Sequence, residues 1–567
     1  SSRGFPGSFI VDGVATRDPG CPPDRQAGAN CVFDYGPYNL LIPEAERTGF
    51  MLQARNGFGN GLEVFGELAL QHNRSIAQGA PTPIDDGAGL SVPVTHPNNP
   101  FPGASEILIR RFRTVDAGPR IWDIETDNVR GVLGLRGKIA DWKWEVSAQR
   151  ARSESDQTGN RHQGWVRTDF LQQQINLGNY NPFGGTVNPQ SVIDAITTSL
   201  VRQGQSDLTS YNAEISGDLF ELPAGKVGLA AGAEYREEKI QDVPDDQFQR
   251  GLIFGTEAVS AKASRDVYAG YVEASVPVVK GLDLDLALRY DHYSDFGSTT
   301  NPKVAVRWAP IDTLAFRASW GTGFRAPSLA QIGLGPSQES QFFTDTYGCA
   351  DNPAYCAATD YTIVFSGNPN LKAEESETYN IGVAWQPNSN VRVSVDYWDI
   401  QQDKKIDEVP FGYLYQNNCN VQSSTVCVRG NPLPGDTLGP LQSVNSTFFN
   451  IGKQSVNGVD VSGYYALDVM GGTLAFSLDY SRLLEFQREE LNSDGTKMVK
   501  RDLTGEYEYP EDRFVAGIDW RMDTWGATAN INYVGSFEDQ PDFDFDGVLD
   551  YDQYHTRKVG SFTTVNL

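Results

Sequence analysis

The sequence predicts an all-β protein, a transmembrane antiparallel β-barrel, on three observations. Apolar and polar residues alternate, as in 282–290, where every second residue is apolar and the others are mostly charged. Tryptophan and tyrosine lie at opposite ends of the apolar faces, and short connections alternate with long ones. A period of two gives a strand one apolar face. The positions of the aromatic residues and the alternating connections are typical of strands that cross an outer membrane.

The aromatic residues predict two girdles. Trp525 and Tyr533 share one face and lie eight residues apart, which is about 26 Å along a strand. A tilt of roughly 40° reduces this to about 20 Å of height, close to the apolar band of about 25 Å in outer-membrane barrels. The short-turn girdle is assigned to Trp142, Trp144, Trp308, Trp385, Trp520 and Trp525, and the other girdle to Tyr235, Tyr290, Tyr397, Tyr480 and Tyr533.

Composition excludes several classes. The 567 residues carry a net charge of −27, which argues against a nucleic-acid partner. Mean hydropathy is −0.40, and no apolar run reaches the length of about 18 residues that a membrane helix needs. A membrane barrel is still allowed, because alternation halves the mean hydropathy. No signal peptide is visible, and we expect that segment to be missing from the sequence, because Ser1 begins in mid-domain sequence.

The six cysteines form three close pairs in loops rich in Gly, Pro, Asn and Asp. Short-range disulfides in an oxidising compartment are the favoured interpretation, and metal binding is the weaker alternative because there is no CxxC pair. The expected pairs are Cys21 with Cys31, Cys349 with Cys356, and Cys419 with Cys427. The five histidines show no paired spacing, so they support no metal or acid–base site. No carboxylate pair stands out as that of a glycosidase either, and we expect no catalytic residues and no enzyme.

The chain divides into a loop region over 1–47, with one disulfide, and a barrel over 48–567. A short helix is expected over 189–202. Because unpaired strand edges are costly in hydrocarbon, an odd number of strands with open ends indicates a barrel that is incomplete at both ends. The seventeen expected strands lie at about 48–58, 61–72, 121–138, 142–154, 207–220, 225–239, 265–279, 281–295, 299–309, 312–323, 374–386, 390–402, 445–468, 472–486, 510–521, 524–537 and 558–567.

The polar faces of these strands would line the lumen. Such side chains could form a solute path, or they could simply solvate the barrel interior. The candidates are Glu234, Arg236, Asp283, Asp285, Arg289, Arg307, Arg317, Arg392 and Asp396. Loop aromatics such as Tyr180, Phe183, Phe343, Tyr347 and Tyr415 could stack on a solute ring or pack loop against loop.

One acidic loop has the spacing of half a calcium site. Asp542, Asp544, Asp546 and Asp550 alternate around a glycine in sixth position, but Gln553 occupies the twelfth position, where a bidentate glutamate is usual. A structural calcium ion would be the one cofactor. A solvated acidic loop is the other interpretation.

Two stretches, 320–329 (WGTGFRAPSL) and 367–382 (GNPNLKAEESETYNIG), resemble the barrel of TonB-dependent outer-membrane receptors. Residues 450–460 and 558–567 resemble further segments of that family. The second motif departs from the family pattern at one position, where Ala373 replaces the proline that is more usual before the glutamate. The resemblance implies a barrel of 22 strands around a plug domain. The plug, its TonB box and five strands would be absent from this sequence.

The resemblance implies a receptor in the outer membrane of a Gram-negative bacterium. It would take up a scarce solute too large for porins, with TonB, lipid and lipopolysaccharide as partners and outer-membrane accessory subunits as a further candidate. Oligosaccharides and ferric siderophores are the expected solutes. The acidic loops favour a neutral or cationic solute, such as an oligosaccharide, over a strongly anionic ferric chelate. The alternatives are a passive porin-like channel and a secreted all-β carbohydrate-active protein.

Overall fold

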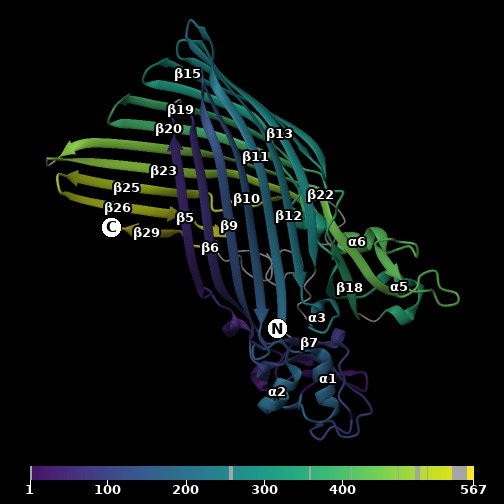
Figure 1. The fold of residues 1–567 in the computed structure, drawn as a ribbon. Helices are drawn as coiled ribbons and strands as arrows, with labels where there is room; N and C mark the ends of the chain where they lie inside the picture. The colour runs from purple at the N-terminus through teal and green to yellow at the C-terminus, as the bar shows by residue number, and fades with distance from the viewer. Residues whose placement is uncertain are drawn as a thin grey trace.

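The computed structural model shows one large antiparallel wall whose strand order closes as a barrel (Figure 1). Of its twenty-one strands, β17, β18, β21 and β24 belong to connections, which leaves the seventeen that the sequence predicts. The structure describes residues 3–59, 61–254, 260–356, 359–409, 411–469, 471–491, 498–506, 508–538 and 558–567. Within that part of the chain, no helix is long and apolar enough to cross a membrane.

Most wall strands extend beyond the expected bounds at the ends that meet the long connections. They are β5 (Ala45–Gly57), β6 (Glu63–Gly79), β9 (Arg120–Ile139), β10 (Trp142–Gly159), β11 (Leu200–Leu222), β12 (Gly225–Pro244), β13 (Ala261–Val279), β14 (Leu282–Tyr293), β15 (Gly297–Ile311), β16 (Leu314–Arg325), β19 (Glu374–Asn388), β20 (Val391–Glu408), β22 (Leu441–Val469), β23 (Gly472–Leu491), β25 (Asp512–Met522), β26 (Trp525–Val534) and β29 (Phe562–Asn566).

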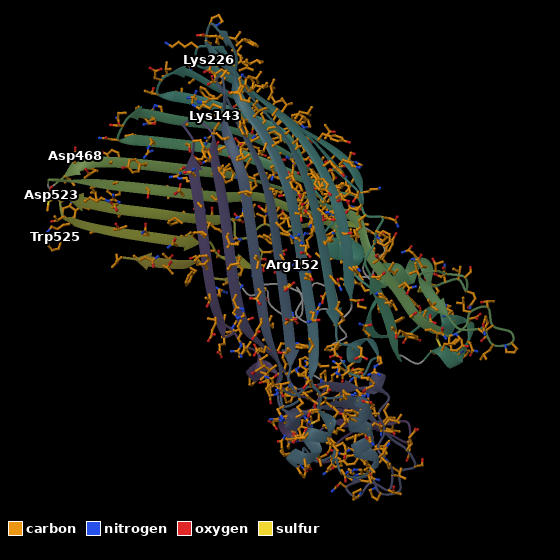
Figure 2. The ribbon with its side chains drawn as sticks, in the orientation of Figure 1. Lys143, Arg152, Lys226, Asp468, Asp523 and Trp525 are labelled. Atoms are coloured by element: carbon orange, nitrogen blue, oxygen red, sulfur yellow. A yellow bond between two sulfur atoms is a disulfide. The ribbon has the colours of Figure 1, made fainter. Side chains whose placement is uncertain are left out.

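The ends of the wall differ from the expectation of two open edges. The strand order is closed, with β29 followed by β5. Short turns gather along one rim, where Figure 2 shows Lys226, Asp468 and Asp523, and the long connections lie at the opposite end of the strands (Figure 1). That the barrel lacks further strands and a plug remains a prediction.

The register separates the wall into an outer apolar face and an inner charged face. Cross-strand partners share a face, and Leu286 pairs with Val304 and Ala274, whereas Asp283 pairs with Arg307. Leu286 is 40% exposed and Val306 36%, so the apolar stripe is not covered by protein. Followed from strand to strand, the same register places all predicted girdle residues on the outer face and all predicted lumen residues on the inner face.

Two of the girdle tryptophans lie flat against glycines of the neighbouring strands. A Cβ built on Gly217 would lie 2.7 Å from the Trp142 ring, and one on Gly137 would lie 3.1 Å from the Trp144 ring. The absence of a side chain at these glycines gives the rings room to pack on the backbone, as aromatic residues do over strand glycines. These two rings therefore cover the outer face of the wall at its short-turn end.

Residues 1–47, expected to be loop, contain two strands of a separate small module. β1 (Ser8–Val11) lies between β2 (Val14–Arg17) and β8 (Ile107–Arg113) in a four-stranded sheet completed by β7 (Pro83–Asp85). Helices α1 (Thr168–Asn176) and α2 (Gln190–Ile196), the latter shorter than expected, pack on the same buried core. We call this unit the N-terminal module. It lies at the long-connection end, beyond β6 and β9 (Figure 1), and its disulfide joins Cys21 to Cys31.

A second unit, the loop module, is built from the two connections between β16 and β22. It contains β17 (Ser337–Phe343), β18 (Thr359–Ser366), α5 (Thr346–Asp351), α6 (Phe411–Asn418) and β21 (Cys427–Arg429) around one apolar core. β18 runs parallel to the first residues of β22, which continues into the wall. The other two predicted disulfides, Cys349–Cys356 and Cys419–Cys427, are both present in this module.

The remaining short elements lie in connections. They are β3 (Gln26–Ala27), β4 (Asn30–Cys31), α3 (Asp246–Gln249), α4 (Leu329–Gly333), β24 (Met498–Asp502), β27 (Phe537–Glu538), β28 (Lys558–Val559) and the 3₁₀ turns Pro23–Arg25, Gly36–Tyr38, Asp86–Ala88, Val115–Ala117 and Pro353–Tyr355.

Candidate functional site: the inner face and the loop module

The inner face near the short turns carries a ladder of ion pairs. Arg307 Nη1 donates to Asp283 at 3.2 Å, and Arg317 Nε donates to Asp396 at 2.6 Å. Arg307 and Arg317 are direct cross-strand partners. Each arginine therefore pairs with a carboxylate on the side that faces away from the other arginine. This limits the repulsion between like charges placed opposite one another.

Gly382 makes the Arg317–Asp396 pair possible. Arg317 is on β16 and Asp396 on β20, with Gly382 of β19 between them in the register. A Cβ on Gly382 would lie 1.9 Å from the Asp396 carboxylate and 3.0 Å from Arg317 Nε. A glycine inside a strand often marks such a close approach. The ion pair thus passes over the intervening strand through the space that the missing side chain leaves.

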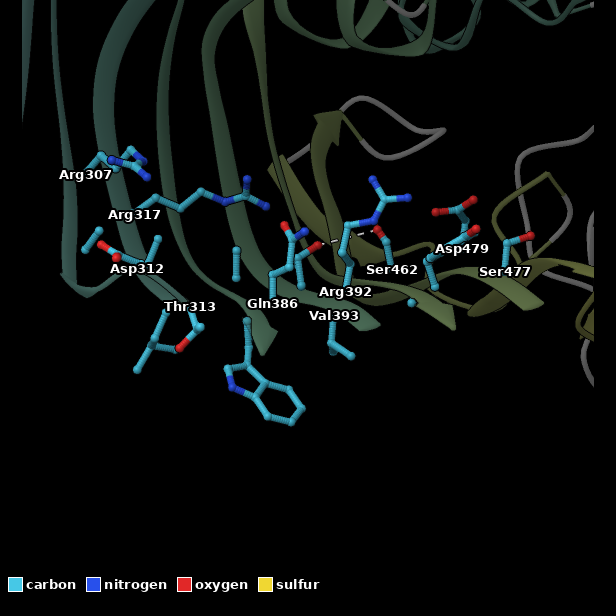
Figure 3. A pocket seen from close by; sticks show the side chains of 18 residues that line it. Arg307, Asp312, Thr313, Arg317, Gln386, Arg392, Val393, Ser462, Ser477 and Asp479 are labelled. Atoms are coloured by element: carbon cyan, nitrogen blue, oxygen red, sulfur yellow. Dashed lines mark hydrogen bonds between the residues drawn. The ribbon is translucent and has the colours of Figure 1, made fainter. Parts of the chain in front are cut away.

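Beside this ladder lies a pocket of about 600 Å³. Figure 3 shows the side chains of Arg307, Arg317 and Arg392 on one side of the wall and Val393 on the other. The Arg392 guanidinium lies over the Tyr464 ring, 4.5 Å from its centroid. Asp479 and Ser462 also line the pocket, so this part of the inner surface offers both signs of charge.

A second charged cluster lies farther along the inner face, toward the long connections. Arg236 donates to Glu234 and Glu238, both at 2.6 Å, and Arg289 reaches Glu234 at 3.2 Å and Asp291 at 2.8 Å. Glu238 also accepts from Arg265 at 2.7 Å. The sequence-based candidates in this cluster are therefore in contact with one another. Asp285, by contrast, lies opposite Ala305 and is exposed.

The two sequence motifs that carry the family resemblance are joined by one ion pair. Arg325, from the first motif, donates through both Nε and Nη2 to the Glu374 carboxylate of the second, with Nε at 2.6 Å. Glu374 is only 1% exposed and also accepts from Gln402 and from the Ile406 backbone N–H. Because the Arg325 contacts are intramolecular, the structure favours a structural role for this motif arginine over contact with a solute.

The loop module is held by a buried ion pair. The side chains of Arg429 and Asp345 are both 0% exposed. Two nitrogens of Arg429 donate to the Asp345 carboxylate at 2.7 and 2.9 Å, and the guanidinium also donates to the Cys419 and Gly439 carbonyls. Tyr415 donates to Asp345 at 2.8 Å. Such full hydrogen bonding is what allows charges to be buried.

The environment of this pair shifts two pKa values. Burial acts to raise the pKa of Asp345, but the bonds from Arg429, the Gly348 N–H and Tyr415 outweigh it, so the pKa lies below its ordinary value. Burial, together with the bond to Asp345, raises the pKa of Tyr415 to about 12. Both groups therefore keep one protonation state, charged and neutral respectively, around neutral pH.

The loop aromatics pack against one another. Tyr180 and Phe183 are buried in the N-terminal module, and Phe343, Tyr347 and Tyr415 pack in the loop module with ring centroids 5.1 to 5.3 Å apart. Tyr180, Phe183 and Tyr415 are buried in these cores, and Phe343 and Tyr347 are partly buried against them, so the structure favours loop packing over stacking on a solute for this set.

The four aspartates of the candidate calcium loop lie outside the described residues. Within the described residues, no group of three or more His, Cys, Asp or Glu side chains is arranged to hold a metal ion.

A closed antiparallel wall with an apolar outer face and a charged interior defines a transmembrane β-barrel. Comparison with known proteins specifies the class. The family model for the β-barrel of TonB-dependent receptor-like proteins matches residues 94–567. The chain therefore belongs to the TonB-dependent receptors, whose barrels lie in the outer membrane of Gram-negative bacteria.

Curated relatives are distant and longer. The vitamin B12 transporter BtuB of Vibrio vulnificus is 23% identical over 315 residues, covering 55% of this chain and 37% of that protein. The probable TonB-dependent siderophore receptor PirA of Acinetobacter baumannii is 23% identical over 164 residues, 28% and 20% of the two chains. The sequence thus spans well under half the length of these relatives.

Solved structures share the fold. The siderophore receptor PirA from Acinetobacter baumannii aligns with a TM-score of 0.51 at 14% identity, covering 93% of this chain and 74% of that one. The RagAB peptide transporter aligns with a TM-score of 0.52 at 12% identity, covering 87% and 58%.

Sequence reasoning missed several residues of this site. Gly382 carried a signal, because it interrupts an alternating strand. Asp345 and Arg429 carried none, because 84 residues separate them and neither lies in a periodic segment. Arg265 lies at a polar position of β13 that could have been added to the lumen set by alternation alone.

Proposed function

We propose that this chain is the barrel of an outer-membrane receptor that takes up a scarce solute too large for porins, with energy supplied through TonB. The observation that carries the proposal is the closed wall with its two contrasting faces, in a chain that matches the receptor barrel over residues 94–567. The long connections and both modules would face the cell exterior, since outer-membrane barrels have short periplasmic turns. The solute would enter from that side.

The solute would be an oligosaccharide or a ferric siderophore. Proteins similar to this one are named for vitamin B12, siderophores and peptides, so the family match alone selects no solute. The polar inner face suits a hydrophilic cargo. We infer that the receptor binds and moves its solute without transforming it, and that a plug domain with a TonB box, outside the present sequence, makes the contact with TonB.

The test is uptake by cells that express the full-length gene. Accumulation of radiolabelled ferric siderophores and oligosaccharides would be compared in tonB⁺ and tonB⁻ strains. We expect saturable uptake of one solute class that disappears without TonB. Uptake that persists in the tonB⁻ strain and rises linearly with concentration would instead establish a passive porin-like channel, and large single-channel conductance in planar bilayers would support that result.

A further inference from the structure

A row of long polar side chains crosses four strands of the inner face where the wall meets the long connections. Gln402 of β20 pairs with Gln454 of β22, Gln454 with Arg488 of β23, and Arg488 with Arg501 of β24. Gln402 lies six residues after Asp396 on the same strand, so the row continues the charged face of the wall. Its members offer amide and guanidinium donors side by side.

The two ends of the row have partners within the chain. Gln402 donates to the Glu374 carboxylate at 2.5 Å, and Arg501 forms an ion pair with Glu506 at 2.8 Å. Each of these carboxylates lies outside the row. Both ends are thus held in place by the surrounding wall.

Among the described residues, the middle of the row contains a buried donor without an acceptor. Arg488 Nε has no hydrogen-bond partner there, and the Arg488 guanidinium lies over the Phe486 ring, 5.7 Å from its centroid. Arg501, directly opposite, is a like charge, an arrangement that destabilises a strand pair. A buried donor that is left unsatisfied also destabilises the fold. Both costs are relieved when an anionic acceptor binds.

We propose that Arg488, flanked by Gln454 and Arg501, binds an anionic, oxygen-rich group of the transported solute. The planar guanidinium can donate two parallel hydrogen bonds to a carboxylate or phosphate, and the Gln454 amide supplies a further donor. This inference rests on the proposed function and narrows its solute class. It also revises the expectation of a neutral or cationic solute, because that expectation came from the acidic loops, whereas two arginines lie side by side in this row of the inner face.

Two sources of the anion fit this chemistry: an acidic oligosaccharide and a ferric carboxylate chelate. The purified full-length receptor would be titrated calorimetrically with hexagalacturonate, ferric citrate and, as a neutral probe, maltohexaose. We expect one anionic probe to bind and the neutral probe not to bind. Arg488→Gln should weaken that binding about tenfold or more, since a hydrogen bond to a charged group is lost. Arg488→Lys keeps the positive charge but loses the paired guanidinium donors. Its affinity should lie between that of the wild type and that of Arg488→Gln.

The matched control is Arg482→Gln, on the same strand but on the outer face, where Arg482 pairs with Glu511 and Asp512. It should leave the affinity unchanged within about twofold. The inference is overturned if neither anionic probe binds, if maltohexaose binds as tightly, or if Arg488→Gln and Arg482→Gln behave alike. None of these results bears on TonB-dependent uptake, which tests the proposed function separately.

Discussion

The wall and the loop module reach stability by opposite means. In the wall, apolar side chains such as Leu286 face outward and remain exposed, and ion pairs such as Arg317–Asp396 lie on an open inner face, with Arg317 49% exposed. The loop module instead buries its apolar residues and one fully enclosed ion pair, Arg429–Asp345. The difference shows which surroundings each region requires. The wall needs a bilayer around it, and the module folds against itself in water.

This contrast predicts that the largest single-residue effect lies in the module. Arg429→Met leaves the Asp345 charge buried without its partner, which should cost about 3–5 kcal/mol of local stability. Hydrogen exchange of the module peptides would measure it, while the heat-dependent gel shift of the barrel stays unchanged. Lys453→Ala, in an exposed wall pair with Asp403, should leave stability nearly unchanged, because solvent screens exposed pairs. Equal losses in the two variants would contradict the contrast.

The wall should be most sensitive on its outer face. Leu286→Arg places a charge near the bilayer midplane and should cost roughly 2–4 kcal/mol, measured by denaturant unfolding from lipid vesicles. Ala305→Arg adds the same side chain to the inner face, opposite Asp285, and should be tolerated. If the two substitutions cost the same, the assignment of outer and inner faces fails.

Acid should loosen the module before the wall. The folded pKa of Asp345 lies below its ordinary value of 3.8, so its contribution to stability is fully present above that value and is lost as the pH falls through the folded pKa. Protease digestion at stepwise lower pH should therefore release module fragments below about pH 4 while the barrel stays intact. In Asp345→Asn this acid-dependent step should be absent, and its persistence there would assign it to another group.

The smallest effect is expected where a glycine leaves room for an exposed ion pair. Gly382→Ala should displace Asp396 from Arg317 and cost about 1 kcal/mol, since partly exposed pairs contribute little. Gly463→Ala is the control, because a Cβ there meets nothing within 4 Å. Unfolding in vesicles would compare the two. A Gly463→Ala loss as large as that of Gly382→Ala would argue against the packing explanation.

Alternation made the wall predictable from the sequence. In a strand such as Leu282–Tyr293, apolar and polar residues alternate, so each residue can be assigned to one face from the sequence. For this reason the sequence predicted the seventeen strands and the faces on which the girdle and inner-face residues lie. The errors lay at the strand ends. Most strands extend past the expected bounds, as β10 does over residues 155–159, where both faces are polar and the period is lost. A few, such as β26, end short of the expected bounds.

The modules could not be predicted in this way. β1 pairs with β8, about a hundred residues later, and β18 pairs in parallel with β22. Neither pairing is encoded in local periodicity, because each strand is short and its partner is remote. The cysteines were the exception, since close spacing between two of them in a loop is a local signal. Likewise, the acceptor for Arg325 is Glu374, 49 residues later, and nothing local in the sequence marks that pair.

The continuity of β22 has a mechanical consequence. Its 29 residues run without an intervening loop from the loop module, where residues 443–447 pair with β18, through a full crossing of the wall. A hinged lid needs a flexible joint, and this strand provides none. The neighbouring β20 does change register around Lys404, which has a positive φ of 57°. The other neighbour, β23, changes register beside Asn457. A load applied to the module would therefore be carried along β22 into the barrel, and bending would concentrate at these two irregularities beside it.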